Sequence, residues 1–269
     1  MQILNLIHIE NSTIKYKVFH FPDGEIQIEL GEFSHKEDVL IKCRITNAEE
    51  LMVLCQVMDI LDRHEIEYST RIYYLMSMRM DRVMDFNRPF SLKVVTKILN
   101  SYNCQSYEII EPHSNTTQTL CKHCYPFYGE CRPDFSNYQI VFPDAGAKER
   151  YSLGYEQDLC ITCSKVRDEA TGRILEIKIN NPEDLLKKPL MIIDDLCDGG
   201  GTFCGIAQAF NKLGITKDKL NISVVHMVNP KGIENLSKNF NHVWFTNSYK
   251  DWENLPENIT MLDIIECAG

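Results

Sequence analysis

Two kinds of hydrophobic pattern alternate along this chain. Short apolar or alternating runs are typical of buried and half-buried strands, and longer stretches carry apolar residues at helical spacing. The pattern predicts helices at residues 49–64, 88–99 and 202–213, with a further helix after Gly146. It predicts strands at residues 15–20, 25–30, 39–42, 71–76, 107–110, 138–142, 159–163, 190–193, 222–228 and 242–246.

The ends of two helices are marked by particular residues. Asn47 and Glu50 have the spacing of an N-terminal capping box before the helix at 49–64. Pro89 is expected in the first turn of the helix at 88–99, where its missing N–H costs least. These signals support the alternation of strands and helices read from the hydrophobic pattern.

The order of elements predicts an α/β fold. Short apolar strands that alternate with helices indicate mainly parallel sheets with helices on their faces. Residues 115–136 show little periodicity, so we place a domain boundary there. The expected organisation is therefore two domains, residues 1–130 and residues 131–269.

Composition narrows the class of protein. With 28 Lys and Arg against 38 Asp and Glu, the formal charge of −10 argues against nucleic-acid partners, because few cations remain to displace phosphate counterions. No stretch approaches the roughly 18–20 apolar residues of a membrane span, and the N-terminus lacks a basic flank, so no membrane association and no export are expected. The 11 cysteines then indicate reduced thiols and a cytoplasmic location.

The segment MIIDDLCDGGGTF (residues 191–203) carries the sharpest chemical signal. Consecutive glycines let backbone N–H groups approach a phosphate closely, and the following helix N-terminus adds attraction for an anion. Thr202 is expected to cap that helix, and the carboxylates of Asp194 and Asp195 suit ribose hydroxyls. A plain turn with solvated acids is the alternative, but open α/β sheets bind ligands at this edge. The predicted ribose-phosphate site is Asp194, Asp195, Asp198, Gly199, Gly200, Gly201 and Thr202.

Several further segments give the chain a family resemblance. They are FPDGE (21–25), RMDR (79–82), RPFSLK (88–93), PHS (112–114), PDAGA (143–147) and KVR (165–167). Together with the glycine-rich loop, they occur in the order seen in ribose-phosphate pyrophosphokinases, and the resemblance runs from about residue 19 to residue 228. It implies two tandem phosphoribosyltransferase-like domains and a homo-oligomer built from dimers, up to a hexamer. It also implies Mg²⁺-dependent transfer of a diphosphoryl group from ATP to the anomeric hydroxyl of ribose 5-phosphate.

The resemblance assigns catalytic and metal-binding roles to individual residues. Lys165 and Arg167 match the cations of a flexible loop that closes over the phosphates in the similar enzymes. Both would neutralise charge during transfer. His113 resembles the His that contacts the metal and ATP, and Asp144 resembles the pyrophosphate-loop Asp that shares Mg²⁺. A His and an Asp suit this ion, which usually takes only one or two protein ligands.

The resemblance also assigns an ATP site. Arg79 and Asp81 lie in the segment that matches the family's ATP-binding residues. Phe21, Asp23 and Glu25 match a loop that reaches into a neighbouring subunit's ATP site and stacks on adenine. Pro-Asp-Gly is also strong turn chemistry, so a plain hairpin remains open beside this reading.

Some features depart from the family pattern. The phosphate loop of these enzymes usually has Thr or Ser where this chain has Gly199. A hydrogen bond to a charged group contributes roughly 1.5–3 kcal/mol, so Gly199 predicts weaker binding of a simple 5-phosphate and leaves space for a further group. This favours ADP-ribose over ribose 5-phosphate as acceptor, as in a similar enzyme of phage-encoded NAD⁺ reconstitution, and then the location would be the host cytoplasm. Met80 replaces a usual Gln, and the segments that build the regulatory site of the longer enzymes are hard to locate.

Three other readings stay open at this point. A catalytically inactive regulatory homologue would bind nucleotide without releasing AMP, and retention of the charged site residues speaks against it. A phosphoribosyltransferase would share the Asp-Asp–Gly loop but not the other segments. A structural zinc site could form at Cys121, His123, Cys124 and Cys131. Cys160 and Cys163 have the same spacing but lie in an expected strand, where they point to opposite faces.

Overall fold

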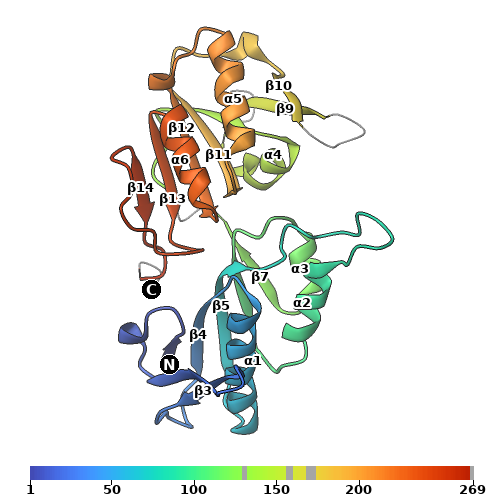
Figure 1. The fold of residues 1–269 in the computed structure, drawn as a ribbon, viewed down its shortest axis with the longest axis vertical. Helices are drawn as coiled ribbons and strands as arrows, with labels where there is room; N and C mark the ends of the chain where they lie inside the picture. The colour runs from blue at the N-terminus through green and yellow to red at the C-terminus, as the bar shows by residue number, and fades with distance from the viewer. Residues whose placement is uncertain (129–131, 156–159, 168–173, 267–269) are drawn as a thin grey trace. The chain divides into compact units, whose positions relative to one another are not determined.

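A computed structural model describes residues 1–128, 132–155, 160–167 and 174–266 of the chain (Figure 1). The chain divides into two compact units, Met1–Tyr128 and Gly129–Gly269. Each unit holds its own sheet and its own apolar core, and the two are described separately below.

Unit 1 is built on a five-stranded parallel sheet in the order β1-β4-β5-β6-β7. A two-stranded antiparallel hairpin, β2–β3, stands beside it as a separate sheet. Three α-helices follow strands of the parallel sheet, as parallel connections require. The strands are β1 (Gln2–Asn5), β2 (Tyr16–His20), β3 (Ile26–Leu30), β4 (Val39–Ile45), β5 (Tyr68–Leu75), β6 (Tyr107–Ile110) and β7 (Cys124–Phe127), and the helices are α1 (Ala48–Arg63), α2 (Ser91–Leu99) and α3 (Thr116–Leu120).

The predicted cap of α1 is present in a modified form. The Asn47 side chain accepts from the backbone N–H of Glu50 at 3.0 Å, which satisfies one orphan donor of the first turn. Glu50 in turn accepts from the backbone N–H and the hydroxyl of Thr46, one residue before the cap. The helix then buries its apolar stripe, including Leu54, Val57, Met58 and Leu61, in the core of unit 1.

Unit 2 is built on a seven-stranded sheet in the order β10-β9-β8-β11-β12-β13-β14. Only the β9–β10 pair is antiparallel among the described strands of this sheet. α5 and α6 lie side by side and bury Phe203, Ile206, Phe210 and Leu236 in the core (Figure 1). The strands are β8 (Gln139–Phe142), β9 (Ile161–Arg167), β10 (Ile174–Ile179), β11 (Leu190–Cys197), β12 (Leu220–Met227), β13 (His242–Thr246) and β14 (Ile259–Leu262), and the helices are α4 (Ala145–Tyr151), α5 (Gly201–Lys212) and α6 (Pro230–Asn239).

The fold confirms the predicted α/β class, and several local predictions need correction. β9 runs to Arg167, so Lys165 lies in a strand rather than in a loop after it. The segment at 115–136 contains α3 and β7, although its sequence shows little periodicity. α2 begins at Ser91, so Pro89 precedes the helix instead of standing in its first turn. The expected elements also omit β1, β10, β14 and α6.

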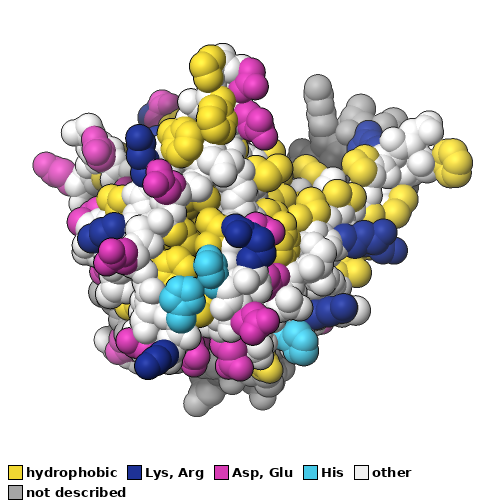
Figure 2. Space-filling model, turned by 90° about the horizontal axis from the view of Figure 1, so that it is seen from below, with side chains coloured by type: hydrophobic (Ala, Val, Ile, Leu, Met, Phe, Trp, Pro, Cys, Tyr) yellow, Lys and Arg dark blue, Asp and Glu magenta, His cyan; other side chains and the backbone are white. Residues whose placement is uncertain are grey.

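Charged side chains of both signs lie on one face of the molecule (Figure 2). On the face shown in Figure 2, basic and acidic side chains are interspersed, and no continuous basic area covers that face. Among the residues that the structure describes, no helix has the length and apolar character needed to cross a membrane.

Candidate active site at the carboxyl edge of the second sheet

The two adjacent acids of β11 share one arginine. Arg150, on α4, donates from Nη2 to Asp194 Oδ1 at 2.8 Å and to Asp195 Oδ1 at 2.7 Å. The backbone N–H of Asp195 also donates to Asp194 Oδ1 at 3.0 Å. Since the Asp195 side chain is 2% exposed and that of Asp194 is 12% exposed, Asp194 offers the more accessible carboxylate. Both acids therefore lie within β11, before the glycine-rich loop. Arg150 is their counter-ion, and the sequence did not suggest it.

The pKa values at this centre differ from their ordinary values. Burial, with Asp195 close by, raises the pKa of Asp194 well above its ordinary value. Burial by itself lowers the pKa of Arg150, but Asp195, Asp194 and Tyr151 together more than offset this and raise it. Arg150 therefore stays charged, and donor groups such as sugar hydroxyls would stabilise an ionised Asp194 carboxylate.

A second arginine forms hydrogen bonds with the backbone of β11 and of its neighbour β12. Arg132 donates from Nη2 to the Asp194 carbonyl oxygen at 3.0 Å and from Nη1 to the Ser223 carbonyl oxygen at 3.2 Å. Its guanidinium stacks 4.5 Å from the centroid of the Tyr151 ring, which also faces Arg150 at 5.6 Å. Tyr151 therefore has two guanidinium groups within cation–π distance of its ring.

Asp144 and Lys165 form a second charged centre. Asp144 is the N-cap of α4, and its Oδ1 accepts from the Ala147 N–H at 3.1 Å. Its Oδ2 accepts from Lys165 Nζ at 2.7 Å. Burial raises the pKa of Asp144, but Lys165, the Ala147 N–H and Arg150 together lower it below its ordinary value, so the carboxyl group stays ionised. Two residues that the sequence assigns to metal binding and catalysis are thus brought into direct contact.

The glycine-rich loop follows β11 and leads into α5. Gly200 is the N-cap of α5 with a φ of 77°, a left-handed conformation that glycine adopts without strain. The predicted cap was Thr202, which instead lies within the first turn, because the helix begins at Gly201. A Cβ atom added to Gly199 would meet nothing within 4 Å, so the space beside this residue is open.

The predicted residues of unit 1 lie on separate parts of that unit. His113 is half-buried just after β6, next to Glu111, which is fully buried and has a φ of 43°. Arg79 and Asp81 lie between β5 and α2, and Arg79 is exposed. In sequence these four residues follow the carboxyl ends of β5 and β6, the edge where ligands bind in open α/β sheets.

The hairpin reading of residues 21–25 is confirmed. The Gly24 N–H donates to the Phe21 carbonyl oxygen at 2.8 Å, and the Glu25 N–H donates to Asp23 Oδ1 at 3.1 Å. Phe21 is 46% exposed and makes an edge contact with Phe19 at a centroid distance of 5.4 Å. The tip of the β2–β3 hairpin therefore presents an aromatic ring and two acids to its surroundings.

The proposed zinc ligands are only partly described. A hydrogen bond between the thiols of Cys121 and Cys124 raises the pKa of Cys121 and lowers that of Cys124. Cys131 lies outside the described residues, as does the side chain of Arg167 at the end of β9. Within the described part of the chain, no three His, Cys, Asp or Glu side chains are grouped closely enough to hold a metal ion.

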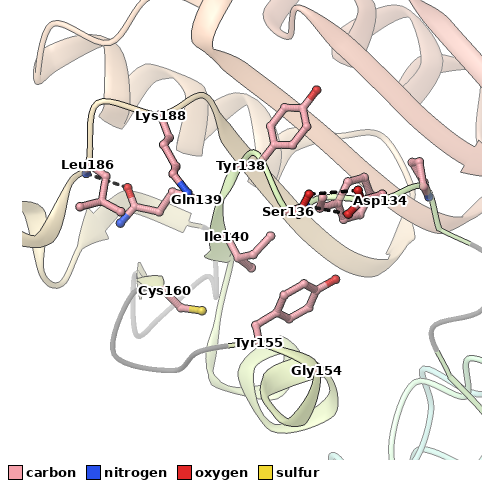
Figure 3. Close-up of a pocket in the computed structure, with 12 residues that line it drawn as sticks. Asp134, Ser136, Tyr138, Gln139, Ile140, Gly154, Tyr155, Cys160, Leu186 and Lys188 are labelled. Atoms are coloured by element: carbon pink, nitrogen blue, oxygen red, sulfur yellow. Dashed lines mark hydrogen bonds between the residues drawn. The ribbon is translucent and has the colours of Figure 1, made fainter.

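A cavity of about 560 Å³ lies elsewhere in unit 2. Figure 3 shows Tyr138, Ile140, Tyr155 and Lys188 among its lining residues. It borders Gln139, the first residue of β8, and Cys160, which directly precedes β9. It therefore lies at the amino ends of these strands, whereas Asp144 follows the carboxyl end of β8, and the cavity is separate from the candidate site.

Comparison with known proteins bears on both the sequence and the fold. A ribose-phosphate pyrophosphokinase of Agrobacterium fabrum is 25% identical over 228 residues, which cover 78% of this chain and 70% of that protein. A ribose-phosphate pyrophosphokinase of Xylella fastidiosa is 27% identical over 229 residues, covering 76% of this chain and 67% of that protein. The sequence is similar to ribose-phosphate pyrophosphokinases. No protein-family model matches it.

The fold comparison points the same way. The crystal structure of phosphoribosylpyrophosphate synthetase from Mycobacterium smegmatis superposes with a TM-score of 0.77 and covers 96% of this chain and 88% of that one. Identity is 18%, so this likeness establishes the fold and not the activity. The fold is that of a phosphoribosylpyrophosphate synthetase, which confirms the predicted architecture, and the named relatives support the predicted enzyme class.

Proposed function

We propose that this protein transfers the β,γ-diphosphoryl group of ATP to the anomeric hydroxyl of a 5-phosphoribosyl acceptor and releases AMP. The observation that carries the proposal is the junction of β11 and α5. There, the accessible Asp194 carboxylate is followed by Gly199–Gly201 and the N-terminus of a 12-residue helix. The similarity to ribose-phosphate pyrophosphokinases across three quarters of the chain supports the same reaction.

The reaction divides into bond changes that the site residues would support. The acceptor's anomeric oxygen forms a bond to the β-phosphorus of ATP while the bond from that phosphorus to the oxygen bridging it to the α-phosphorus breaks. AMP leaves with the bridging oxygen, and the hydroxyl proton passes to solvent. Little covalent chemistry falls to the protein, whose work is to position the two substrates and to neutralise phosphate charge.

Each part of the acceptor has a matching group in unit 2. The glycine-rich loop and the N-terminus of α5 suit the 5-phosphate, because backbone N–H groups and the helix dipole attract an anion. Asp194 suits the ribose hydroxyls, which would donate to its carboxylate. Asp195 is almost completely buried against Arg150, so in this proposal it anchors Arg150 and does not itself contact the sugar.

Lys165 is proposed as the cation of the transfer step. In the structure its ammonium is bound by Asp144 at 2.7 Å, and the Asp144 side chain is 36% exposed. Such a pair can exchange partners at low cost, because neither group is fully desolvated. Lys165 would move from the carboxylate to the transferred phosphates when the nucleotide binds.

The available donors fit Mg²⁺ as a partner of the nucleotide. Asp144 provides a partly exposed carboxylate in unit 2, and, separately, His113 is a half-buried side chain of unit 1 just after β6. Mg²⁺ usually keeps several waters and takes one or two protein carboxylates plus substrate phosphates, so it does not need a dedicated cluster of protein ligands. When bound, the ion supplies charge neutralisation at the phosphate oxygens.

Ribose 5-phosphate is the first acceptor that we propose, because the relatives are ribose-phosphate pyrophosphokinases. ADP-ribose is a second candidate on a specific observation. The open space beside Gly199, where the similar enzymes carry a hydroxyl residue, leaves room for a group attached to the 5-phosphate.

The test is acceptor-dependent release of AMP from ATP, measured with each acceptor in the presence of Mg²⁺. AMP released with ribose 5-phosphate or with ADP-ribose, and not without acceptor, would support the reaction and identify the acceptor. ATP binding without AMP release with either acceptor would instead favour a catalytically inactive homologue.

A further inference from the structure

One stripe of α6 faces the glycine-rich loop. Asn229 is the N-cap of α6, and Gly232 and Asn235 follow at intervals of three residues, so all three lie on the same side of the helix. α6 is itself held in the core of unit 2 by Ile233 and Leu236. The loop therefore packs against a rigid surface that belongs to a different helix from α5, the one it leads into.

Gly232 allows the closest contact between the two segments. A Cβ atom at this position would lie 2.2 Å from the Asp198 carbonyl oxygen and 3.0 Å from Cys197 Sγ. No side chain fits there, so the Asp198 carbonyl is directed at the backbone of α6. In a trans peptide the N–H points opposite to the C=O. The Gly199 N–H is therefore directed away from α6.

The two asparagines fix the rest of the loop. Asn235 donates from Nδ2 to the Gly199 carbonyl oxygen at 2.7 Å. Asn229 donates from Nδ2 to Asp198 Oδ1 at 3.0 Å while its own Oδ1 accepts from the Lys231 N–H and caps α6. Residues of α6 thus contact two backbone carbonyl groups and one carboxylate of the loop.

We propose that Asn229, Gly232 and Asn235 are positioning residues that hold the phosphate loop in its anion-binding conformation before the acceptor arrives. The inference rests on the proposed function in one respect, since it takes this loop to be the phosphate site. Holding the loop in advance removes the cost of ordering it on binding, so loss of these contacts weakens phosphate binding. None of the three residues needs to touch the reacting atoms.

Asn235→Ala is the main test, with Asn239→Ala as its matched control. Asn239 lies one turn further along α6 and donates to the Asn235 carbonyl oxygen and to Cys204 Sγ, and none of its described bonds involves the loop. We expect Asn235→Ala to weaken binding of inorganic phosphate, measured calorimetrically, by about fivefold or more. The control should bind phosphate as the parent protein does, with both variants unfolding within a few degrees of it.

Kinetics separate a positioning role from a merely structural one. Asn235→Ala should raise KM for the acceptor while KM for ATP stays within about twofold of the parent value. Gly232→Ala should weaken phosphate binding more strongly than Asn235→Ala does. If Gly232→Ala fails to fold, Asn235→Ala still tests the proposal.

Equal phosphate affinity in Asn235→Ala and Asn239→Ala would overturn the inference while leaving the proposed reaction intact. Conversely, selective loss of phosphate binding in Asn235→Ala would support the inference even if the parent protein released no AMP. A parent protein that binds no phosphate would overturn the inference, while acceptor-dependent AMP release would still decide the proposed reaction.

Discussion

Two charged centres of unit 2 hold their acids in different ways. At the first, Asp194 and Asp195 share Arg150, and the three side chains are 12%, 2% and 11% exposed. At the second, Asp144 and Lys165 form a single pair whose side chains are 36% and 17% exposed. The first centre is buried and places two carboxylates on one guanidinium, whereas the second is more open and pairs one carboxylate with one ammonium.

Because of this difference, the two cations have different roles: Arg150 is fixed in place, whereas Lys165 can change its partner. Removal of Arg150 would take away the cation that two buried carboxylates share, which is strongly destabilising. Arg150 is therefore a structural residue. A partly exposed lysine loses little when it changes partner, so Lys165 is available for chemistry. The comparison therefore predicts that Arg150 variants fail mainly in stability and Lys165 variants mainly in turnover.

Replacement of Arg150 should have the largest effect. Arg150→Met removes the guanidinium that bonds the carboxylates of both Asp194 and Asp195, and we expect the free energy of unfolding to fall by roughly 3–5 kcal/mol. Chemical denaturation measures this loss. Arg63→Met is the matched control, since Arg63 pairs with Asp59 at a well-exposed site and its loss should cost less than about 1 kcal/mol. A loss for Arg150→Met as small as that of the control would show that the buried centre is not a structural element.

Lys165→Ala is expected to lower turnover by about 10²–10³-fold, because a cation at the transferred phosphates stabilises the transition state. The free energy of unfolding should change by less than about 1 kcal/mol. Lys178→Ala serves as control, because Lys178 lies exposed on β10, beside β9, where it pairs with Ser164 in register. Steady-state AMP release compares the two, and near-normal turnover of Lys165→Ala would remove Lys165 from the mechanism.

Asp194→Asn should stabilise the protein and impair acceptor binding. Because the folded-state pKa of Asp194 is raised, its stabilising contribution is fully present below the unfolded pKa of about 4 and is lost as pH rises through the folded pKa. The asparagine carries no such charge, so the variant should gain about 1 kcal/mol relative to the parent at pH 8 and almost nothing near pH 4. Thermal unfolding across this pH range measures the gain, and a destabilised variant at pH 8 would contradict the raised pKa of Asp194 in the folded protein.

Gly199→Ser should have the smallest effect on the fold, less than about 0.5 kcal/mol, because the added side chain enters open space. The restored hydroxyl should lower KM for ribose 5-phosphate and raise KM for ADP-ribose. Gly201→Ser is the comparison, as a Cβ there also meets nothing within 4 Å. An unchanged ratio of the two KM values would remove Gly199 as a determinant of acceptor choice.

The sequence predicts the central strand, loop and helix of unit 2 well. The apolar run before Asp194 and the glycines before Phe203 mark the end of a buried strand and the start of a helix, and both are local signals. β7 escapes prediction because Pro126 stands within it, a residue that a parallel strand tolerates here at the edge of the sheet. The order β1-β4-β5-β6-β7 places β7 at that edge.

The counter-ion of the acids could not be predicted in the same way. Arg150 lies 44 positions before Asp194 in sequence, and its contact depends on how α4 sits against β11. Likewise, the family resemblance predicts Lys165 on a loop, whereas pairing with β10 extends the strand to Arg167. Contacts with another segment decide both cases, and the local sequence does not show them.

The most direct test of the central claim is AMP formation from ATP with ribose 5-phosphate or ADP-ribose, compared between the parent protein, Lys165→Ala and Lys178→Ala. The account predicts acceptor-dependent AMP release by the parent protein and by Lys178→Ala, and a loss of about 10²-fold or more in Lys165→Ala. No AMP release by the parent protein with either acceptor would contradict it.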